Sequence, residues 1–326
     1  MSVILGIEST AHTFGIGIVK NGKILANVKH TYTTEIGGII PIEAARHHET
    51  HKFEIYFEAL TNAKVDEKEI DAISFSNAPG LAPCLLEGMK FAKELSKKLN
   101  VPLIPVNHCI AHLEIGKTTG AKDPVMLYCS GANTQIIAYA AGKYRIFGET
   151  LDIGVGNFID NFARYAGIGF PGGPVIQRLA ESGKYTELPY NVKGMDVAFS
   201  GILTKLKQML ESKKYSIEDL SFSLQETVFA MLVETAERAL AHTGKNELLL
   251  GGGVACNNRL QEMCKIMCKE RGAKLFVPEN SLLTDNGAMI AYLGEIIFKS
   301  GIKEKTEEVD IKPRQRTDEV KVSWKD

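Results

Sequence analysis

Two histidines four residues apart, His108 and His112, have the types and the spacing of metal ligands. The segment Asn107–Glu114 reads NHCIAHLE, and on a helix this spacing places both imidazoles on one face. Two imidazoles from one helix are a common half of a metal site, to which a distant carboxylate can add a third ligand. The segment therefore predicts a metal centre, provided that an acidic side chain reaches the pair.

A second pair with the same spacing, His47 and His51, competes with the first. Neither pair matches the HExxH pattern of zinc peptidases, because Cys109 follows His108 and His48 follows His47. The general-base glutamate of such peptidases is therefore not in its usual place. Spacing alone does not decide which pair binds a metal. For either pair the simpler interpretation is a structural role, in which one histidine caps the helix and the other packs against it.

A candidate for the third ligand is Asp285, in the segment TDNGA that opens the last predicted helix. Aspartate at a helix start is also a common N-cap, so two interpretations of this residue stay open. The chain contains neither the GxSxG elbow of serine hydrolases nor the GxxxxGK[ST] loop of P-loop proteins. A nucleophile triad is therefore not predicted.

Glycine-rich turns follow predicted strands at equivalent places in the chain. Gly6–Thr10 ends the first strand, and Ser130–Thr134 ends the strand that begins a similar series of elements later. A third run, Gly251–Gly253, precedes a helix, and the backbone amides at a helix start favour an anion. Asn257 would offer an amide to a base or ribose there. The alternative interpretation of this run is a tight structural turn. Gly169–Pro174 is too rich in glycine and proline for a helix or a central strand, so it predicts a rigid loop.

The elements that must position these residues follow from hydrophobic periodicity and turn signals. A three-stranded meander followed by alternating helices and strands occurs twice, which predicts two lobes with a ligand cleft between them. We expect an N-terminal lobe at 1–123 and a C-terminal lobe at 124–326, with a charged, less regular tail from 303. Predicted strands are 3–8, 14–20, 24–31, 72–76, 103–106, 125–130, 134–140, 144–150, 247–250 and 274–277. Predicted helices are 41–63, 85–99, 108–117, 157–166, 174–182, 202–212, 217–243, 258–271 and 285–299.

The composition is that of an ordinary globular protein, with 44% hydrophobic residues, 24% charged residues and a formal net charge of −1. A chain that binds nucleic acid alone usually carries a basic excess, so a nucleic-acid substrate would require a local basic patch or a partner. The six cysteines form no CxxC pattern, and no apolar run reaches the length of a membrane span. We therefore expect a cytoplasmic protein that does not enter the membrane.

The motifs together resemble one family. They are GIESTAHT, HCIAH, YCSGANTQ, GETLDIGVGN, GFPGGP, FSG, GGGVACNNRL and TDNGAMIAY, and the resemblance runs from about Val3 to Ile297. The set resembles the tRNA N6-adenosine threonylcarbamoyltransferases, in the archaeal and eukaryotic form that is the catalytic subunit of the KEOPS complex. The family's older name, O-sialoglycoprotein endopeptidase, does not fit the missing HExxH motif. The paired turns also resemble the actin/hexokinase/Hsp70 (ASKHA) superfamily, so we expect a two-lobed α/β fold of that type with a central nucleotide cleft.

The resemblance implies transfer of a threonylcarbamoyl group from threonylcarbamoyl-AMP to N6 of the tRNA adenosine on the 3′ side of the anticodon. It implies one iron or zinc ion on His108, His112, Tyr128 and Asp285. It also implies a donor site, which ATP or ADP would fit as well, formed by Tyr128, Cys129, Ser130, Gly131, Ala132, Asp160, Gly173, Gln177 and Asn257. In that site Asp160 would accept a hydrogen bond from a ribose hydroxyl. The implied partners are tRNA, a small atypical kinase, a small dimerising subunit and a further tRNA-binding subunit.

Two positions depart from the family pattern. Ala132 stands where a second glycine is usual, and it would be strained if that position required a positive φ. Gln177 stands where many members have Glu, so we assign it no general-base role and name no catalytic residue beyond the metal ligands. Two other functions stay open: a small-molecule kinase of the ASKHA type, suggested by the paired turns, and a nucleotide-sensing scaffold without catalytic activity.

Overall fold

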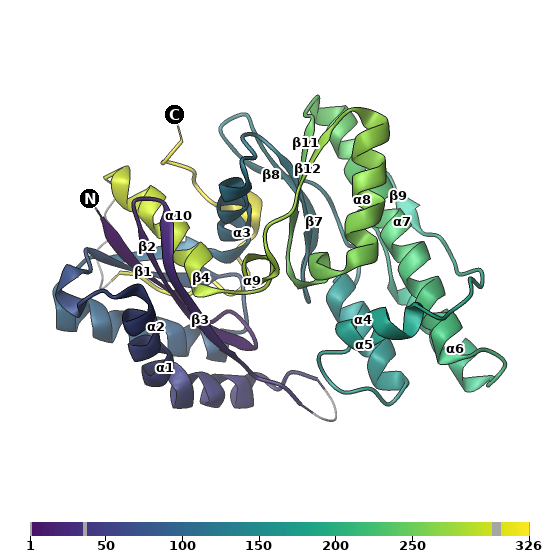
Figure 1. Cartoon of the computed structure of the whole chain (residues 1–326), viewed down its shortest axis with the longest axis horizontal. Coiled ribbons are helices and arrows are strands. Elements are labelled where there is room, and N and C mark those ends of the chain that lie inside the picture. Colours follow the sequence, from purple (N-terminus) through teal and green to yellow (C-terminus); the bar gives the residue numbers. More distant parts are fainter. Residues whose placement is uncertain (1, 35–37, 302–307, 326) are drawn as a thin grey trace.

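The computed structural model describes residues 2–34, 38–301 and 308–325, which form two mixed β-sheets with helices packed on them (Figure 1). The strand order is β3-β2-β1-β4-β5 in the first sheet and β12-β11-β6-β7-β8 in the second. In each sheet three consecutive strands form an antiparallel meander, and two further strands extend it in parallel. The repeated topology that the element order predicts is therefore confirmed.

The strands of the first sheet lie close to their predicted positions. They are β1 (Val3–Glu8), β2 (Thr13–Lys20), β3 (Lys23–Thr31), β4 (Ala72–Ala78) and β5 (Leu103–Asn107). The second sheet contains β6 (Val125–Cys129), β7 (Thr134–Ala140), β8 (Lys143–Glu149), β11 (Glu247–Gly251) and β12 (Lys274–Phe276). Each meander turns through two residues with positive φ, Asn21-Gly22 and Ala141-Gly142, which suits the twist of a tight hairpin. A short hairpin, β9 (Val192–Lys193) and β10 (Asp196–Val197), was not predicted.

Helices pack on both faces of the first sheet. On one face α1 (Pro41–Ala63) contacts β2 and β3, and α2 (Ala82–Leu99) contacts β4; on the other, α10 (Gly287–Lys299) contacts β1, β2 and β4 (Figure 1). Because both faces are covered, every residue of β1 and β4 is buried, including the polar Ser74 and Ser76 of β4. α3 (His108–Gly116) follows β5 directly and contacts both α10 and β11.

The longest helix of the second lobe, α7 (Ile217–Thr243), packs against β6, β7 and β8. The other helices of this lobe are α4 (Val155–Tyr165), α5 (Gly173–Ala180), α6 (Ser200–Glu211), α8 (Asn258–Arg271) and α9 (Asn280–Leu283). α9 was not predicted, and the start of the last helix was placed two residues early, at Asp285 instead of Gly287. The predicted irregular tail contains the short 3₁₀ turn Thr317–Glu319; residues 303–307 and 326 lie outside the described residues.

α10 approaches the first sheet so closely that glycines are required at the contact. A Cβ atom on Gly6 would lie 2.1 Å from the backbone nitrogen of Ala291, and one on Gly17 would lie 2.2 Å from that of Ala288. A buried apolar cluster then joins this layer to the second sheet, with Ile4, Met126 and Ile290 among its members. The division after residue 123 stays a prediction, and the contacts of α10 with the first sheet cross it.

Candidate metal centre

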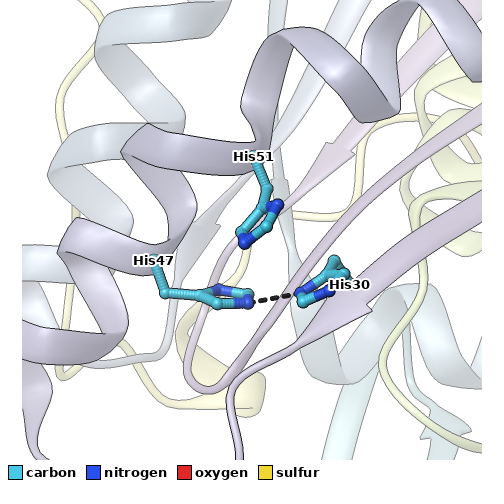
Figure 2. Close-up of side chains that lie close together, drawn as sticks. All are labelled: His30, His47 and His51. Atoms are coloured by element: carbon cyan, nitrogen blue, oxygen red, sulfur yellow. Dashed lines mark hydrogen bonds between the residues drawn. The ribbon is translucent and has the colours of Figure 1, made fainter.

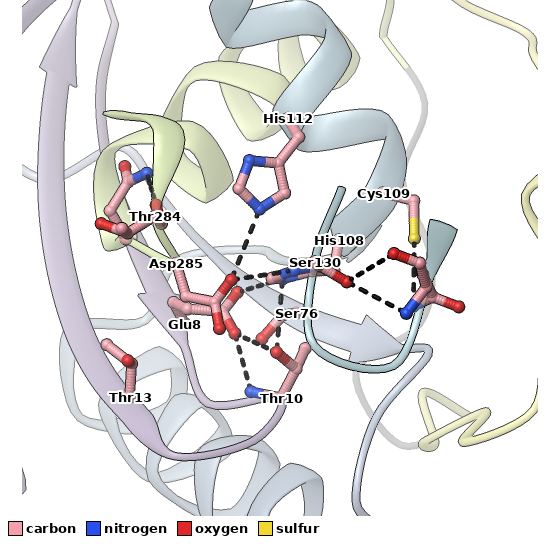
Figure 3. Close-up of polar contacts among 12 residues, drawn as sticks. Glu8, Thr10, Thr13, Ser76, His108, Cys109, His112, Ser130, Thr284 and Asp285 are labelled. Atoms are coloured by element: carbon pink, nitrogen blue, oxygen red, sulfur yellow. Dashed lines mark hydrogen bonds and ion pairs between the residues drawn. The ribbon is translucent and has the colours of Figure 1, made fainter. Parts of the chain in front are cut away.

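Two histidines and an aspartate from opposite ends of the chain meet beside α3 (Figure 3). His108 Nε2 lies 3.3 Å from Asp285 Oδ1, and His112 Nε2 lies 3.5 Å from the same oxygen. The ligand atoms of the three residues all lie within 4.8 Å of one another. The predicted convergence of Asp285 on the His108/His112 pair is what the structure shows.

Local capping explains how these side chains reach one another. Asn107 ends β5 and caps α3, because its Oδ1 accepts hydrogen bonds from the Cys109 and Ile110 amides at 3.0 and 3.2 Å. At the other element Asn286, and not Asp285, is the N-cap of α10: its Oδ1 accepts from the Met289 amide at 2.9 Å. Asp285 is thereby released from capping, and its carboxylate faces the imidazoles.

Glu8, at the end of β1, fixes the orientation of His108. Its Oε2 lies 2.9 Å from His108 Nδ1, and its side chain is fully buried. Thr10 supports this carboxylate, because its backbone amide donates to Glu8 Oε1 at 2.7 Å. His108 donates a hydrogen bond from Nδ1 to Glu8, so its Nε2 faces Asp285. Histidines that bind metals are often oriented by a second carboxylate in the same way. The sequence prediction did not include Glu8, although a lone carboxylate at the end of an apolar strand indicates a buried charge that needs a partner.

Polar atoms without a hydrogen-bond partner gather at the same place. Among the residues that the structure describes, His112 Nδ1 and the Tyr128 hydroxyl are buried and make no hydrogen bond, and His112 Nε2 has only the long contact of 3.5 Å with Asp285. The centroids of these two rings lie 5.1 Å apart. Buried polar groups are normally satisfied, so atoms of this kind beside a carboxylate fit a bound cation.

The charged groups of the centre shift one another's pKa values. Burial alone lowers the pKa of His108, yet the carboxylates of Glu8 and Asp285 raise that pKa well above its ordinary value. Burial would raise the pKa of Asp285, but the His108 imidazolium and hydrogen bonds hold it well below its usual range. Burial lowers the pKa of His112, so this ring is neutral at pH 7 and offers a lone pair. A cation would replace the proton that His108 carries between two carboxylates.

Lys29 on β3 is a further neighbour that the sequence prediction missed. Its ammonium donates to the Asp285 carbonyl at 3.1 Å and also hydrogen-bonds the Thr284 hydroxyl. Burial lowers its pKa, although the Asp285 carboxylate opposes that shift. Lys29 thus binds the backbone of the segment that carries the aspartate.

The residues predicted for the donor site lie in three small groups. Ser130, Gly131 and Ala132 form the turn between β6 and β7, and the Gly156 amide donates to the Ser130 carbonyl at 3.0 Å. Ala132 is not among the residues with positive φ, so the strain that a required positive φ would cause is absent. Cys129 and Tyr128 are fully buried at the end of β6.

The second and third groups lie around α5 and α8. Asp160 Oδ1 accepts from the Gly172 amide at 2.8 Å, just before Gly173 begins α5, and burial raises the pKa of this carboxyl group. Gln177 accepts from the Asn258 amide at 3.2 Å. Asn257 caps α8, because its Oδ1 accepts from the Arg259 amide at 2.9 Å, and its amide group donates to Gln225 at 2.6 Å. Their role in donor binding stays a prediction.

Within the described part of the chain, the competing pair, His47 and His51, meets no aspartate. Instead it meets a third imidazole, His30 of β3, and the ligand atoms of these three side chains lie within 4.8 Å of one another (Figure 2). The two histidine pairs therefore belong to separate clusters of different chemistry.

The two sheets and their helices form a two-lobed α/β fold of the actin/hexokinase/Hsp70 type. Solved structures agree with this class: HypF of Thermococcus kodakarensis superposes with a TM-score of 0.63 at 16% identity, over 94% of this chain and 48% of that one. The activator of 2-hydroxyisocaproyl-CoA dehydratase from Clostridium difficile superposes with a TM-score of 0.54 at 11% identity, over 93% and 99% of the two chains. At these identities the likeness concerns the fold alone.

Sequence comparison is more specific. Residues 23–292 match the model of the family described as TsaD, tRNA N6-adenosine threonylcarbamoyltransferase. A protein of that name from Thermococcus sibiricus is 56% identical over 323 residues, covering 99% of this chain and 100% of the relative. One named a probable tRNA N6-adenosine threonylcarbamoyltransferase from Drosophila melanogaster is 48% identical, with full coverage of both chains. The chain belongs to this family of transferases.

Proposed function

We propose that this chain transfers the threonylcarbamoyl group of threonylcarbamoyl-AMP to N6 of the tRNA adenosine on the 3′ side of the anticodon. In this reaction the N6–C bond to the carbamoyl carbon forms, the bond from that carbon to the AMP phosphate oxygen breaks, and N6 loses one proton. The observation that carries the proposal is the meeting of His108, His112 and Asp285 in a chain of this family.

The centre fits one iron or zinc ion, held by His108, His112 and Asp285 with Tyr128 beside them. Such an ion, when bound, would supply Lewis-acid polarisation of the donor carbonyl. The protein's own contribution is to hold the ligands in place. Glu8 keeps the proton of His108 on Nδ1, and Lys29 binds the backbone at Asp285. Preset ligand positions reduce the entropy lost when the donor binds.

The direct test removes the ligands one at a time. In His112→Ala and in Asp285→Ala we expect the metal bound at this centre and the yield of N6-threonylcarbamoyladenosine to fall together, by at least about 10–100-fold, the loss that replacing a residue behind a ligand already causes. The exposed His242 on α7 supplies the control, because His242→Ala removes an imidazole far along the chain from the centre. Metal content is measured by mass spectrometry and the modified nucleoside by chromatography of tRNA digests. Full transfer activity in the metal-free chain would contradict the proposal.

The proposed partners follow from the same resemblance and from the charge of the chain. We propose that the chain acts in the cytoplasm within a KEOPS-type assembly, with a small atypical kinase, a small dimerising subunit and a further tRNA-binding subunit. The net charge of −1 supports this, because a nearly neutral chain supplies little attraction for the tRNA backbone. Among the described residues no helix is long and apolar enough to cross a membrane.

The two alternative functions make different predictions. A small-molecule kinase would phosphorylate its substrate with ATP independently of His108. A non-catalytic scaffold would leave a reconstituted complex fully active when His112 and Asp285 are replaced. Both outcomes differ from the joint loss of metal and modified nucleoside expected above.

A further inference from the structure

A second group of imidazoles lies outside the centre described above, between β3 and α1 (Figure 2). His30 projects from β3, and His47 and His51 project from successive turns of α1. His30 Nδ1 lies 2.5 Å from His47 Nε2, and the rings of His30 and His51 stack with centroids 4.0 Å apart. His30 is exposed and the other two are half-buried, so an ion from solvent can reach the cluster.

The neighbours of His47 decide which of its nitrogens is free. His48 Nε2 lies 3.0 Å from the Ala11 carbonyl, which only accepts, so this nitrogen of His48 carries a proton. In a neutral ring with its proton on Nε2, the other nitrogen of His48, Nδ1, is an acceptor. His47 Nδ1 lies 3.4 Å from that acceptor and donates to it. The remaining nitrogen of His47, Nε2, therefore directs its lone pair at the cluster, where it accepts the hydrogen bond from His30 Nδ1.

A carboxylate sets the tautomer of His51 in the same way. Glu54 Oε2 lies 3.2 Å from His51 Nδ1, one turn further along α1. Because a carboxylate accepts, the proton of a neutral His51 sits on Nδ1 and its Nε2 is free. An outer carboxylate that holds the far nitrogen of a ligand histidine is a recurrent feature of metal sites.

We propose that His30, His47 and His51 form a second metal site, which binds a divalent transition-metal ion such as Zn²⁺ and leaves a fourth position to water. Three imidazole ligands without a carboxylate ligand suit Zn²⁺, Ni²⁺ or Cu²⁺ and not Mg²⁺ or Ca²⁺, which prefer oxygen ligands. Nitrogens that share a tetrahedral zinc at about 2.0–2.1 Å lie about 3.3 Å apart. The exposed His30 ring must therefore move outward by less than about 1 Å, and its Nδ1 proton transfers to its own Nε2.

The test separates the two metal sites. Zn²⁺ binding is measured by equilibrium dialysis on the full chain and on the His108→Ala/His112→Ala variant. We expect two zinc ions per wild-type chain and one per double variant. Adding His30→Asn to the double variant should weaken the remaining site by at least about 100-fold, and adding Glu54→Gln should weaken it by about 10–100-fold. His30 is exposed, so its replacement should not disturb folding, and thermal melting checks this.

The matched control is His242→Ala, which removes a different exposed histidine and should leave both sites unchanged. If the double variant does not fold, His30→Asn in the wild-type chain should lower the zinc content from two ions to one. The absorption of Co²⁺ in the visible range gives an independent count of tetrahedral sites. Zinc binding that is unchanged by His30→Asn, or a wild-type chain that binds one zinc ion at most, would overturn the proposal.

Discussion

At the scale of single residues, the centre depends on one buried carboxylate that the predicted ligand set does not contain. Glu8 is fully buried, and its closest charged partner is His108 at 2.9 Å. By holding the Nδ1 proton of His108, Glu8 determines which nitrogen faces Asp285. The ligand set alone therefore does not explain the centre.

We predict that Glu8→Gln weakens metal binding by about 10–100-fold, because an amide accepts the His108 proton less strongly than a carboxylate does. Isothermal titration with Zn²⁺ measures the affinity. Glu58→Gln, an exposed change on α1, is the control and should leave the affinity as it is. Equal affinities in Glu8→Gln and wild type would show that Glu8 serves only the fold.

The raised pKa of His108 predicts a pH dependence of stability in the metal-free chain. A histidine whose pKa is raised by folding contributes stability that is complete below its unfolded pKa of 6.5 and is lost as the pH rises through the folded value. His47, His48 and His112, whose pKa values are lowered, act in the opposite direction, and their effect is largely complete once the unfolded chain has lost its histidine charges somewhat above pH 6.5. We therefore expect the free energy of unfolding to fall above pH 6.5.

Urea unfolding in the presence of a chelator, at a series of pH values from 6.5 upward, measures this fall. In His108→Gln the decline should be flatter, because Gln does not titrate. A decline of the same slope in both proteins would assign the pH dependence to another group.

At the scale of elements, the last helix places Asp285, and glycines allow that helix to approach. α10 contacts β1 and β2 at Gly6 and Gly17, where even a Cβ atom would overlap the helix backbone. Asn286 caps the helix, so the residue before it is free to face α3. The position of the carboxylate is thus set by the packing of a helix on a sheet.

We predict that Gly17→Ala destabilises the chain by about 1–3 kcal/mol, the usual cost of overpacking, and weakens metal binding because α10 moves away from the sheet. Chemical unfolding and zinc titration measure the two effects. Gly201→Ala in α6 is the matched control, since nothing lies within 4 Å of the Cβ position of Gly201. This replacement should raise the free energy of unfolding by no more than about 1 kcal/mol, because alanine favours a helix over glycine. A zinc affinity of Gly17→Ala equal to that of the wild type would show that the metal site does not depend on the position of α10.

At the scale of the whole molecule, two sheets of the same topology share one apolar layer, formed around α3 and α10. In this layer α3 carries His108 and His112, so the candidate metal centre lies between the two sheets. The overall charge gives the molecule little general affinity for nucleic acid.

We predict that the isolated chain binds tRNA only in the weak range typical of non-specific contacts, roughly 10⁻⁴–10⁻⁶ M at physiological salt. Addition of the proposed partner subunits should tighten binding and steepen its dependence on salt, because more phosphates are then neutralised. Filter binding at several salt concentrations measures both quantities. Tight, strongly salt-dependent binding by the chain alone would show that a local basic patch suffices.

The sequence by itself determined the elements, the repeat and the two candidate histidine pairs. Apolar spacing, hairpin turns and the positions of Pro and Gly depend on neighbours a few residues away, so α1, α7 and α8 were predicted with the bounds that the structure shows. The family, too, could be recognised from motifs in order, and the comparisons confirm it.

Only the tertiary structure decided which histidine pair receives a carboxylate and which receives another histidine. Glu8 lies 100 positions before His108 in the sequence, and Asp285 lies near the C-terminal end of the chain. No local sequence pattern encodes contacts between residues so far apart. Whether Asp285 capped a helix or faced the imidazoles depended on Asn286 taking the cap, and His30 joined its cluster because β3 packs beside α1. Local periodicity specifies an element, whereas a site formed by distant segments is specified by how those elements pack.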